Sequence, residues 1–122
     1  MSQVLLVEDE PLVAELARDA LAEVGFKVTV ARDDRSAYQA LESEPRSFAV
    51  VVTDINLGRG VTGFDIARRA RQLNCDIKVV YISGQGPHLG KFSVADALMV
   101  EKPFDPCDLA ERVAAFVEPH EG

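Results

Sequence analysis

The sequence predicts one α/β domain built on a doubly wound parallel sheet, for three reasons. Short apolar runs alternate along the 122 residues with segments whose apolar positions recur at helical spacing. Two of these runs, residues 4–7 and 48–52, are apolar without a break, which is typical of strands covered by helices on both faces. A chain of this length buries enough surface for one core and leaves no room for a second domain of ordinary size.

Strands and helices alternate along the chain, which indicates parallel strands joined by crossover helices. The expected strands are residues 4–7, 27–31, 48–52, 77–82 and 98–100. The expected helices lie over residues 11–24, around 37–41, over 63–73 and over 106–117. Pro11 suits a first helical position, Gly25 a helix end and Asp105 an N-cap.

The charge of the chain disfavours some partners. Thirteen Lys and Arg residues against twenty Asp and Glu residues give a net charge of −7. Such a surface repels nucleic-acid phosphates and anionic lipid headgroups, so we expect no direct nucleic-acid partner and no membrane insertion. No apolar run approaches the ~20 residues that span a bilayer, and the N-terminus lacks the features of a signal peptide. We therefore expect a cytoplasmic protein.

Acidic residues follow two strands that the common five-stranded order places side by side. Glu8 and Asp9 come after the first strand, and Asp54 ends the third. Three carboxylates there, mostly shielded from water, repel one another by several kcal/mol unless protons or a cation compensate. Their oxygens, with the backbone carbonyl of Asn56 and waters, suit octahedral Mg²⁺. The alternative is that the acidic triplet at residues 8–10 only favours the positive N-terminus of the first helix.

Two further polar residues are expected at the same edge. Ser83 ends the fourth strand and Lys102 follows the fifth. A hydroxyl and an ammonium beside a metal-bound carboxylate can hold the oxygens of a phosphoryl group on Asp54. Taken singly, a strand-end cap explains Ser83 and an exposed surface position explains Lys102. Pro103, directly after Lys102, favours a cis peptide bond there.

Together these motifs resemble, over about residues 3–118, the receiver domain of two-component response regulators. The motifs, in order, are Glu8-Asp9, Asp54, Ser83-Gly84 and Lys102-Pro103-Phe104. The resemblance implies a flavodoxin-like sheet of strand order 2-1-3-4-5 flanked by five helices, in a single domain of residues 1–122. Because the chain stops after the last expected helix, we expect a stand-alone receiver similar to chemotaxis regulators.

The resemblance also implies roles for the site residues. Asp54 is the phosphoacceptor, Ser83 the switch hydroxyl, and Lys102 the partner of the phosphoryl group. The implied Mg²⁺ ligands are Glu8, Asp9, Asp54 and the backbone carbonyl of Asn56. Such domains take phosphate from a histidine kinase or a histidine phosphotransfer protein and hydrolyse it slowly. We therefore expect a phosphorelay protein that catalyses only its own phosphorylation and dephosphorylation and switches an unidentified downstream partner.

Three departures from the family pattern concern the output of the switch. Three positions before Lys102, where the family has an aromatic switch residue, stands Met99. The loop at 57–63 is slightly longer than usual. The stretch from Ser83 to Lys102 is shorter than usual and rich in glycine, so the fourth of the five helices should be short or malformed. We expect activation to order or shift residues 84–97 rather than to flip a ring.

Three other classes compete with this interpretation. A pseudo-receiver that is never phosphorylated is favoured by Met99 alone. A Mg²⁺-dependent aspartyl phosphohydrolase resembling the haloacid dehalogenases needs a second Asp where Asn56 stands. A flavin- or nucleotide-binding protein needs Gly, Ser or Thr after the first strand, where the acidic triplet at 8–10 would repel phosphate.

Overall fold

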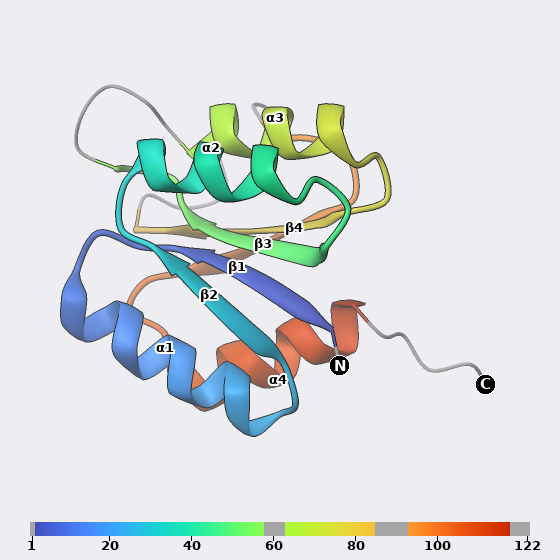
Figure 1. Cartoon of the computed structure of the whole chain (residues 1–122). Coiled ribbons are helices and arrows are strands. Elements are labelled where there is room, and N and C mark those ends of the chain that lie inside the picture. The colour runs from blue at the N-terminus through green and yellow to red at the C-terminus, as the bar shows by residue number, and fades with distance from the viewer. Residues whose placement is uncertain (1, 58–62, 85–92, 118–122) are drawn as a thin grey trace.

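A five-stranded parallel sheet forms the middle layer of the molecule (Figure 1). The computed structural model describes residues 2–57, 63–84 and 93–117. The strands are β1 (Gln3–Val7), β2 (Lys27–Ala31), β3 (Phe48–Asp54), β4 (Lys78–Ser83) and β5 (Ala97–Glu101). Their order, β2-β1-β3-β4-β5, confirms the predicted flavodoxin-like topology. The strands begin or end within two residues of the predicted bounds, and β3 includes Asp54 itself.

Helices cover both faces of the sheet (Figure 1). Helices α1 (Pro11–Glu23) and α4 (Pro106–Val117) lie on one face, and α2 (Asp34–Ser43) and α3 (Gly63–Leu73) lie on the other. The described residues contain four helices where five were predicted. Most of the missing one, between β4 and β5, falls on residues 85–92, which lie outside the described residues, and residues 93–96 are not helical.

Local sequence signals set the helix ends. Pro11 is the first residue of α1, and Gly25 follows that helix with a φ of +103°, which favours glycine. The Asp33 carboxylate caps α2 by accepting a hydrogen bond from the Ser36 N–H at 2.8 Å. Asp105 accepts from the Cys107 N–H at 2.9 Å, which confirms its predicted place at the start of α4.

The core consists of two layers because both faces of the sheet are covered. Successive strand residues point to opposite faces. Leu5 and Val51 pack under α2 and α3, whereas Leu6 and Val52 pack under α1 and α4, and all four are fully buried. This explains why the central strands are apolar at every position.

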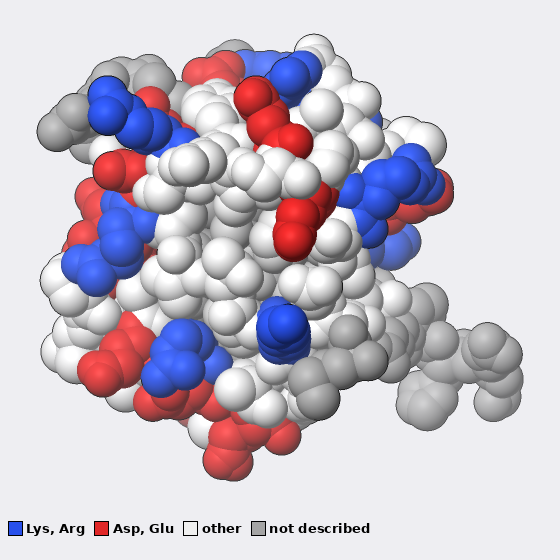
Figure 2. Space-filling view, viewed as in Figure 1, with Lys and Arg blue, Asp and Glu red and all other residues white. Residues whose placement is uncertain are grey.

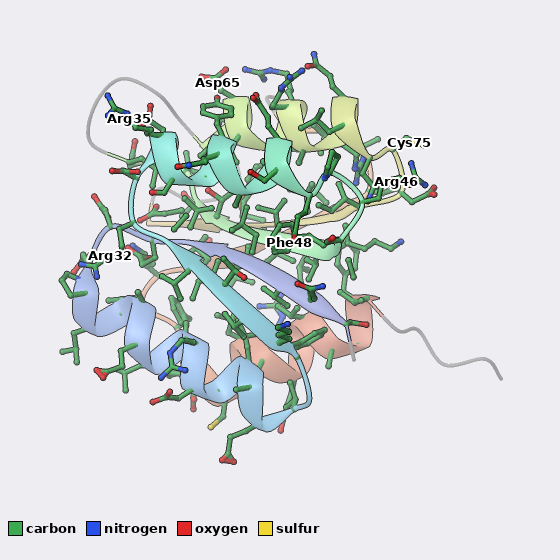
Figure 3. All side chains as sticks on the ribbon, viewed as in Figure 1. Arg32, Arg35, Arg46, Phe48, Asp65 and Cys75 are labelled. Carbon is green, nitrogen blue, oxygen red and sulfur yellow. The ribbon has the colours of Figure 1, made fainter. Side chains whose placement is uncertain are left out.

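Because helices cover both faces of the sheet, polar residues lie mainly at its two other boundaries, where the strands begin and where they end. Arg32 lies at the edge where β2 ends, while Arg46 and Cys75 lie at the opposite edge (Figure 3). On the face in Figure 2, basic and acidic side chains are interspersed rather than gathered by sign. Among the described residues, no helix has the length and apolar character needed to cross a membrane.

Candidate functional site

The carboxyl edge of the sheet brings the predicted acidic residues together. Strands β1 and β3 pair with Val7 opposite Thr53, so the residues that follow, Glu8 and Asp54, are neighbours. One carboxylate oxygen from each of Glu8, Asp9 and Asp54 lies within 4.8 Å of the others. The spatial clustering expected from the strand-end rule is therefore present.

The three carboxylates differ in their exposure to solvent. Glu8 is 0% and Asp54 6% exposed, whereas Asp9 is exposed in the turn between β1 and α1. The expectation that all three are shielded from water is wrong for Asp9, because the chain leaves the sheet at this residue. The site thus has two buried carboxylates and one at its mouth.

Glu8 has an unusual environment for a carboxylate, and its pKa is raised from 4.5 to about 7. Burial is the main cause because it penalises the charged form, and the charge of Asp54 adds to the effect. The Glu10 N–H, which donates to Oε2 at 3.2 Å, and the charge of Lys102 act in the opposite direction. Oε1 accepts no hydrogen bond within the described chain.

Lys102 supplies the positive charge of the site. Its Nζ donates to Asp54 Oδ2 at 2.8 Å and lies 3.5 Å from Glu8 Oε1 and 3.8 Å from Glu10 Oε1. Burial lowers the pKa of Lys102, but the hydrogen bond to Asp54 and the three negative charges raise it above its usual value overall. The Lys102–Pro103 peptide bond is cis, as predicted.

The backbone at Asp54 is held from behind. Thr53 Oγ1 donates to the Asp54 carbonyl oxygen at 3.0 Å, and the Gly63 N–H donates to the Ile55 carbonyl at 2.8 Å. A Cβ on Gly63 would collide with the Asp54 carbonyl oxygen and lie 3.0 Å from Thr53 Oγ1. Gly63 therefore lets α3 begin directly against Asp54. From the sequence, Gly63 is predicted only as a helix start, and its close contact with the Asp54 carbonyl is not predicted.

Of the other predicted residues, Asn56 contacts Asp54 directly, and Ser83 follows Ile82, the register partner of Asp54 on β4. The Asn56 N–H donates to Asp54 Oδ1 at 3.2 Å, which places Asn56 at the site, while its carbonyl as a metal ligand stays a prediction. Ser83 is buried at the end of β4, and its carbonyl accepts from the Lys102 N–H at 2.8 Å. A cavity of about 420 Å³ opens here, lined by Asp9, Glu10, Asp54, Asn56, Gly84 and Lys102.

Met99 lies away from this cavity, half-buried on β5 and paired in register with Tyr81 of β4. Tyr81 is fully buried, as its predicted packing role requires, and its ring lies 5.0 Å from the ring of Phe64. Its hydroxyl accepts a hydrogen bond from the Val94 N–H at 3.1 Å. The aromatic side chain of this region therefore comes from the strand next to Met99.

The donor set fits a hard divalent cation. Clustered carboxylate oxygens are the ligands Mg²⁺ prefers, and the buried Oε1 of Glu8 lacks a hydrogen bond from the described chain. A carboxylate such as Asp54 that also contacts an ammonium can act as a nucleophile toward phosphorus, with positive charge placed for the oxygens of the incoming group.

An apolar groove of about 370 Å³ continues from the 420 Å³ cavity beside Asp54, which we call the acceptor cavity. Glu10 and Lys102 line both. The other residues of the groove are apolar and come from α1, from the segment after β5 and from the first residue of α4: Val13, Leu16, Pro103, Phe104 and Pro106. The cavity beside Asp54 thus opens next to an apolar surface.

Comparison with known proteins gives a consistent result. A family model described as response regulator receiver domain matches residues 4–114. Response regulator receiver protein CpdR of Brucella abortus is 34% identical over 116 residues, which cover 93% of this chain and 94% of that protein. Transcriptional regulatory protein TcrA of Mycobacterium tuberculosis is 29% identical, and the match covers 93% of this chain but 45% of that protein.

Solved structures agree with the sequence comparison. A response regulator receiver protein from Sinorhizobium medicae has a TM-score of 0.88 at 29% identity, with 97% of this chain and 95% of that chain covered. Response regulator protein TrrA from Thermotoga maritima, solved in complex with Mg²⁺ and BeF, has a TM-score of 0.78 at 26% identity, with 95% and 99% covered.

The raised pKa of Glu8 predicts a pH-dependent stability in metal-free buffer. Between pH 4.5 and about 7, the folded protein holds a proton on Glu8 that the unfolded chain has already released. This contribution to the free energy of unfolding is therefore complete below pH 4.5 and is lost as the pH rises through about 7. Glu8→Gln cannot lose this proton. We expect the wild type to lose on the order of 2 kcal/mol relative to Glu8→Gln between pH 5 and pH 8.

Urea unfolding of both proteins with a chelator present measures this difference. Glu44→Gln, which changes an exposed carboxylate after α2, is the matched control and should follow the wild type. Parallel pH profiles for wild type and Glu8→Gln would contradict the assignment.

Proposed function

The chain belongs to the response regulator receiver domain family of two-component systems, and from that premise we propose that it is a phosphoacceptor whose state of phosphorylation on Asp54 controls partner binding. The observation that carries the proposal is the buried carboxylate of Asp54, 2.8 Å from Lys102 Nζ and clustered with Glu8 and Asp9. We place this function in the cytoplasm. The chain acts as an enzyme only on its own phosphoryl group.

The phosphodonor is a histidine kinase or a histidine phosphotransfer protein, in keeping with receiver domains generally. An oxygen of Asp54 attacks phosphorus, the new P–O bond forms as the P–N bond to the donor histidine breaks, and the imidazole takes up a proton. Lys102 Nζ then pairs with a phosphoryl oxygen, while the Asn56 N–H holds the carboxylate in line.

Receiver domains bind Mg²⁺ at an acidic pocket, and here Glu8, Asp9, Asp54 and the carbonyl of Asn56 would hold it. When bound, Mg²⁺ supplies positive charge to the phosphoryl oxygens. Gly84 leaves the front of the site open to water, since a Cβ there would meet no atom of the described residues within 4 Å. Asn56 can orient that water, so the phosphoryl group is hydrolysed slowly without a partner. Gln85, which we expect to flank the same path as a second polar, uncharged residue, lies outside the described residues.

The apolar groove beside Lys102 is the docking surface for the phosphodonor protein. The donor must bring its histidine to Asp54, and the groove shares Glu10 and Lys102 with the acceptor cavity. Leu16 on its wall is 48% exposed, and Leu12, one turn earlier on α1, is 69% exposed. A partner seated there buries apolar surface at the point where the phosphoryl group is transferred.

The output signal passes through the segment before β5. Tyr81 and the switch residue Ser83 are two positions apart on β4, so their side chains leave the strand on the same face. Tyr81 in turn holds the N–H of Val94, and Met99 replaces the aromatic residue usual in the family. We propose that a shift of Ser83 changes the order of residues 93–97 through Tyr81. The preceding residues of the predicted output segment, 85–92, lie outside the described residues.

Asp54 is expected to be the acceptor. Incubation with acetyl phosphate and Mg²⁺ should add the mass of one phosphoryl group to the wild type and none to Asp54→Asn, because the amide is not a nucleophile of comparable strength. Asp76→Asn, at an exposed position, is the control and should gain mass normally. A chelator should abolish the gain. A wild type that gains no mass from any donor would instead be a pseudo-receiver.

Leu16→Asp is expected to slow phosphotransfer from a phosphorylated donor protein about ten-fold, because it places a charge in the docking groove. Its rate with acetyl phosphate should change far less. Val24→Asp is the matched control, because Val24 is 42% exposed on the chain directly after α1 and outside the groove. Equal rates for Leu16→Asp and Val24→Asp would place the donor elsewhere.

Hydrogen exchange with and without beryllofluoride, a phosphoryl mimic, tests the output path. We expect exchange at residues 93–97 to change on activation. Tyr81→Phe removes the acceptor of the Val94 N–H and should speed exchange of that amide roughly three- to ten-fold. Tyr38→Phe, in α2, is the control and should leave it unchanged. Identical exchange of residues 93–97 in both states, with changes on another face, would disprove this path.

A further inference from the structure

The Glu10 carboxylate can interact either with the N-terminus of α1 or with the ammonium of Lys102. Glu10 is the N-cap residue of α1, yet its carboxylate makes no capping hydrogen bond to that helix. Its Oε1 instead lies 3.8 Å from Lys102 Nζ, and its side chain is 65% exposed. The carboxylate is therefore directed toward the acceptor site rather than toward its own helix.

The place of Glu10 in the site differs from that of the three proposed metal ligands. Glu8, Asp9 and Asp54 form the cluster within 4.8 Å, and Glu10 is not part of it. Glu10 lines the acceptor cavity and also the apolar groove that continues from it. A donor that enters at this junction passes the Glu10 carboxylate before it reaches Asp54.

Lys102 only partly neutralises Glu10. Its Nζ is 2.8 Å from Asp54 Oδ2 and a full ångström farther from Glu10 Oε1, so its charge is directed mainly inward. Among the described residues, Lys102 is the basic side chain within ion-pair distance of Glu10. The mouth of the cavity thus carries the negative charge of Glu10 in addition to the charges of the cluster, which a metal ion would neutralise.

We infer that Glu10 is a specificity-determining residue that slows phosphorylation by small phosphodonors in proportion to their negative charge. The inference rests on the proposed acceptor role of Asp54. A dianionic acyl phosphate is repelled about twice as strongly as a monoanionic donor at the same distance. A phosphohistidine protein offsets the same repulsion with the apolar contacts that it makes in the groove. Glu10 thereby favours the protein donor over small acyl phosphates.

The test compares Glu10→Gln with the wild type using two donors, acetyl phosphate, mainly a dianion near neutral pH, and phosphoramidate, mainly a monoanion. Intact-mass time courses at saturating Mg²⁺ give the rates. With screening at 0.1 M salt, we expect Glu10→Gln to be about four-fold faster with acetyl phosphate and about two-fold faster with phosphoramidate. Both differences should disappear at 1 M salt, where the Debye length is about 3 Å.

Glu15→Gln is the matched control, because it makes the same charge change at an exposed position on α1 outside both cavities. It should stay within about 1.5-fold of the wild type with both donors, since its charge is screened. Repeating the rates at twice the Mg²⁺ concentration excludes a change in metal affinity. Equal acceleration with both donors, acceleration that persists at 1 M salt, or no acceleration at all would overturn the inference.

The same experiment separates this inference from the proposed function. A wild type that is phosphorylated by both donors while Glu10→Gln behaves like Glu15→Gln disproves the role of Glu10 alone. A wild type that is phosphorylated by neither donor disproves the acceptor function and the role of Glu10 with it.

Discussion

Two carboxylates, Glu8 and Asp54, are buried at the ends of the neighbouring strands β1 and β3, and the ammonium of Lys102 reaches both from the end of β5. Strand β4 lies between β3 and β5, so the backbones of Asp54 and Lys102 are about 9–10 Å apart across the sheet. The long lysine side chain spans this distance, and the hydrogen bond from the Lys102 N–H to the Ser83 carbonyl, at 2.8 Å, fixes the backbone from which it starts. The geometry of the site therefore depends on the register of four adjacent parallel strands.

The same sheet makes Asp54 rigid on one side and accessible on the other. Behind it, Thr53 and the start of α3 at Gly63 hold its backbone. In front, the cavity opens at Asn56 and Gly84. A nucleophile needs this combination, because a fixed carboxylate costs little reorganisation when a donor arrives, and an open front admits the donor. In the proposed switch, the residues that respond to phosphorylation are then those beyond the cavity, on β4 and β5.

Much of this arrangement can be predicted from the sequence, and the features that cannot be predicted each have a physical reason. Unbroken apolar runs located the buried strands, and the strand-end rule brought Glu8, Asp54 and Lys102 to one edge. The exposure of Asp9 was not predictable, because neighbouring acidic residues give no sign of where the chain leaves the sheet. The role of Gly63 depends on the close approach of α3 to a distant carbonyl. The contact of Glu10 with Lys102 depends on the side-chain conformation of an exposed residue.

The carboxyl edge of the sheet carries more negative charge than its one ammonium can balance. Four carboxylates, Glu8, Asp9, Glu10 and Asp54, lie near one ammonium within the described chain, and the raised pKa of Glu8 shows that repulsion and burial already favour a proton there. A phosphoryl group would add further negative charge to the same cavity. Lys102 alone cannot balance that charge, since it is already shared among three carboxylates. The proposed phosphoryl transfer would therefore require a bound divalent cation, while Glu10, outside the cluster, keeps its charge at the mouth of the cavity.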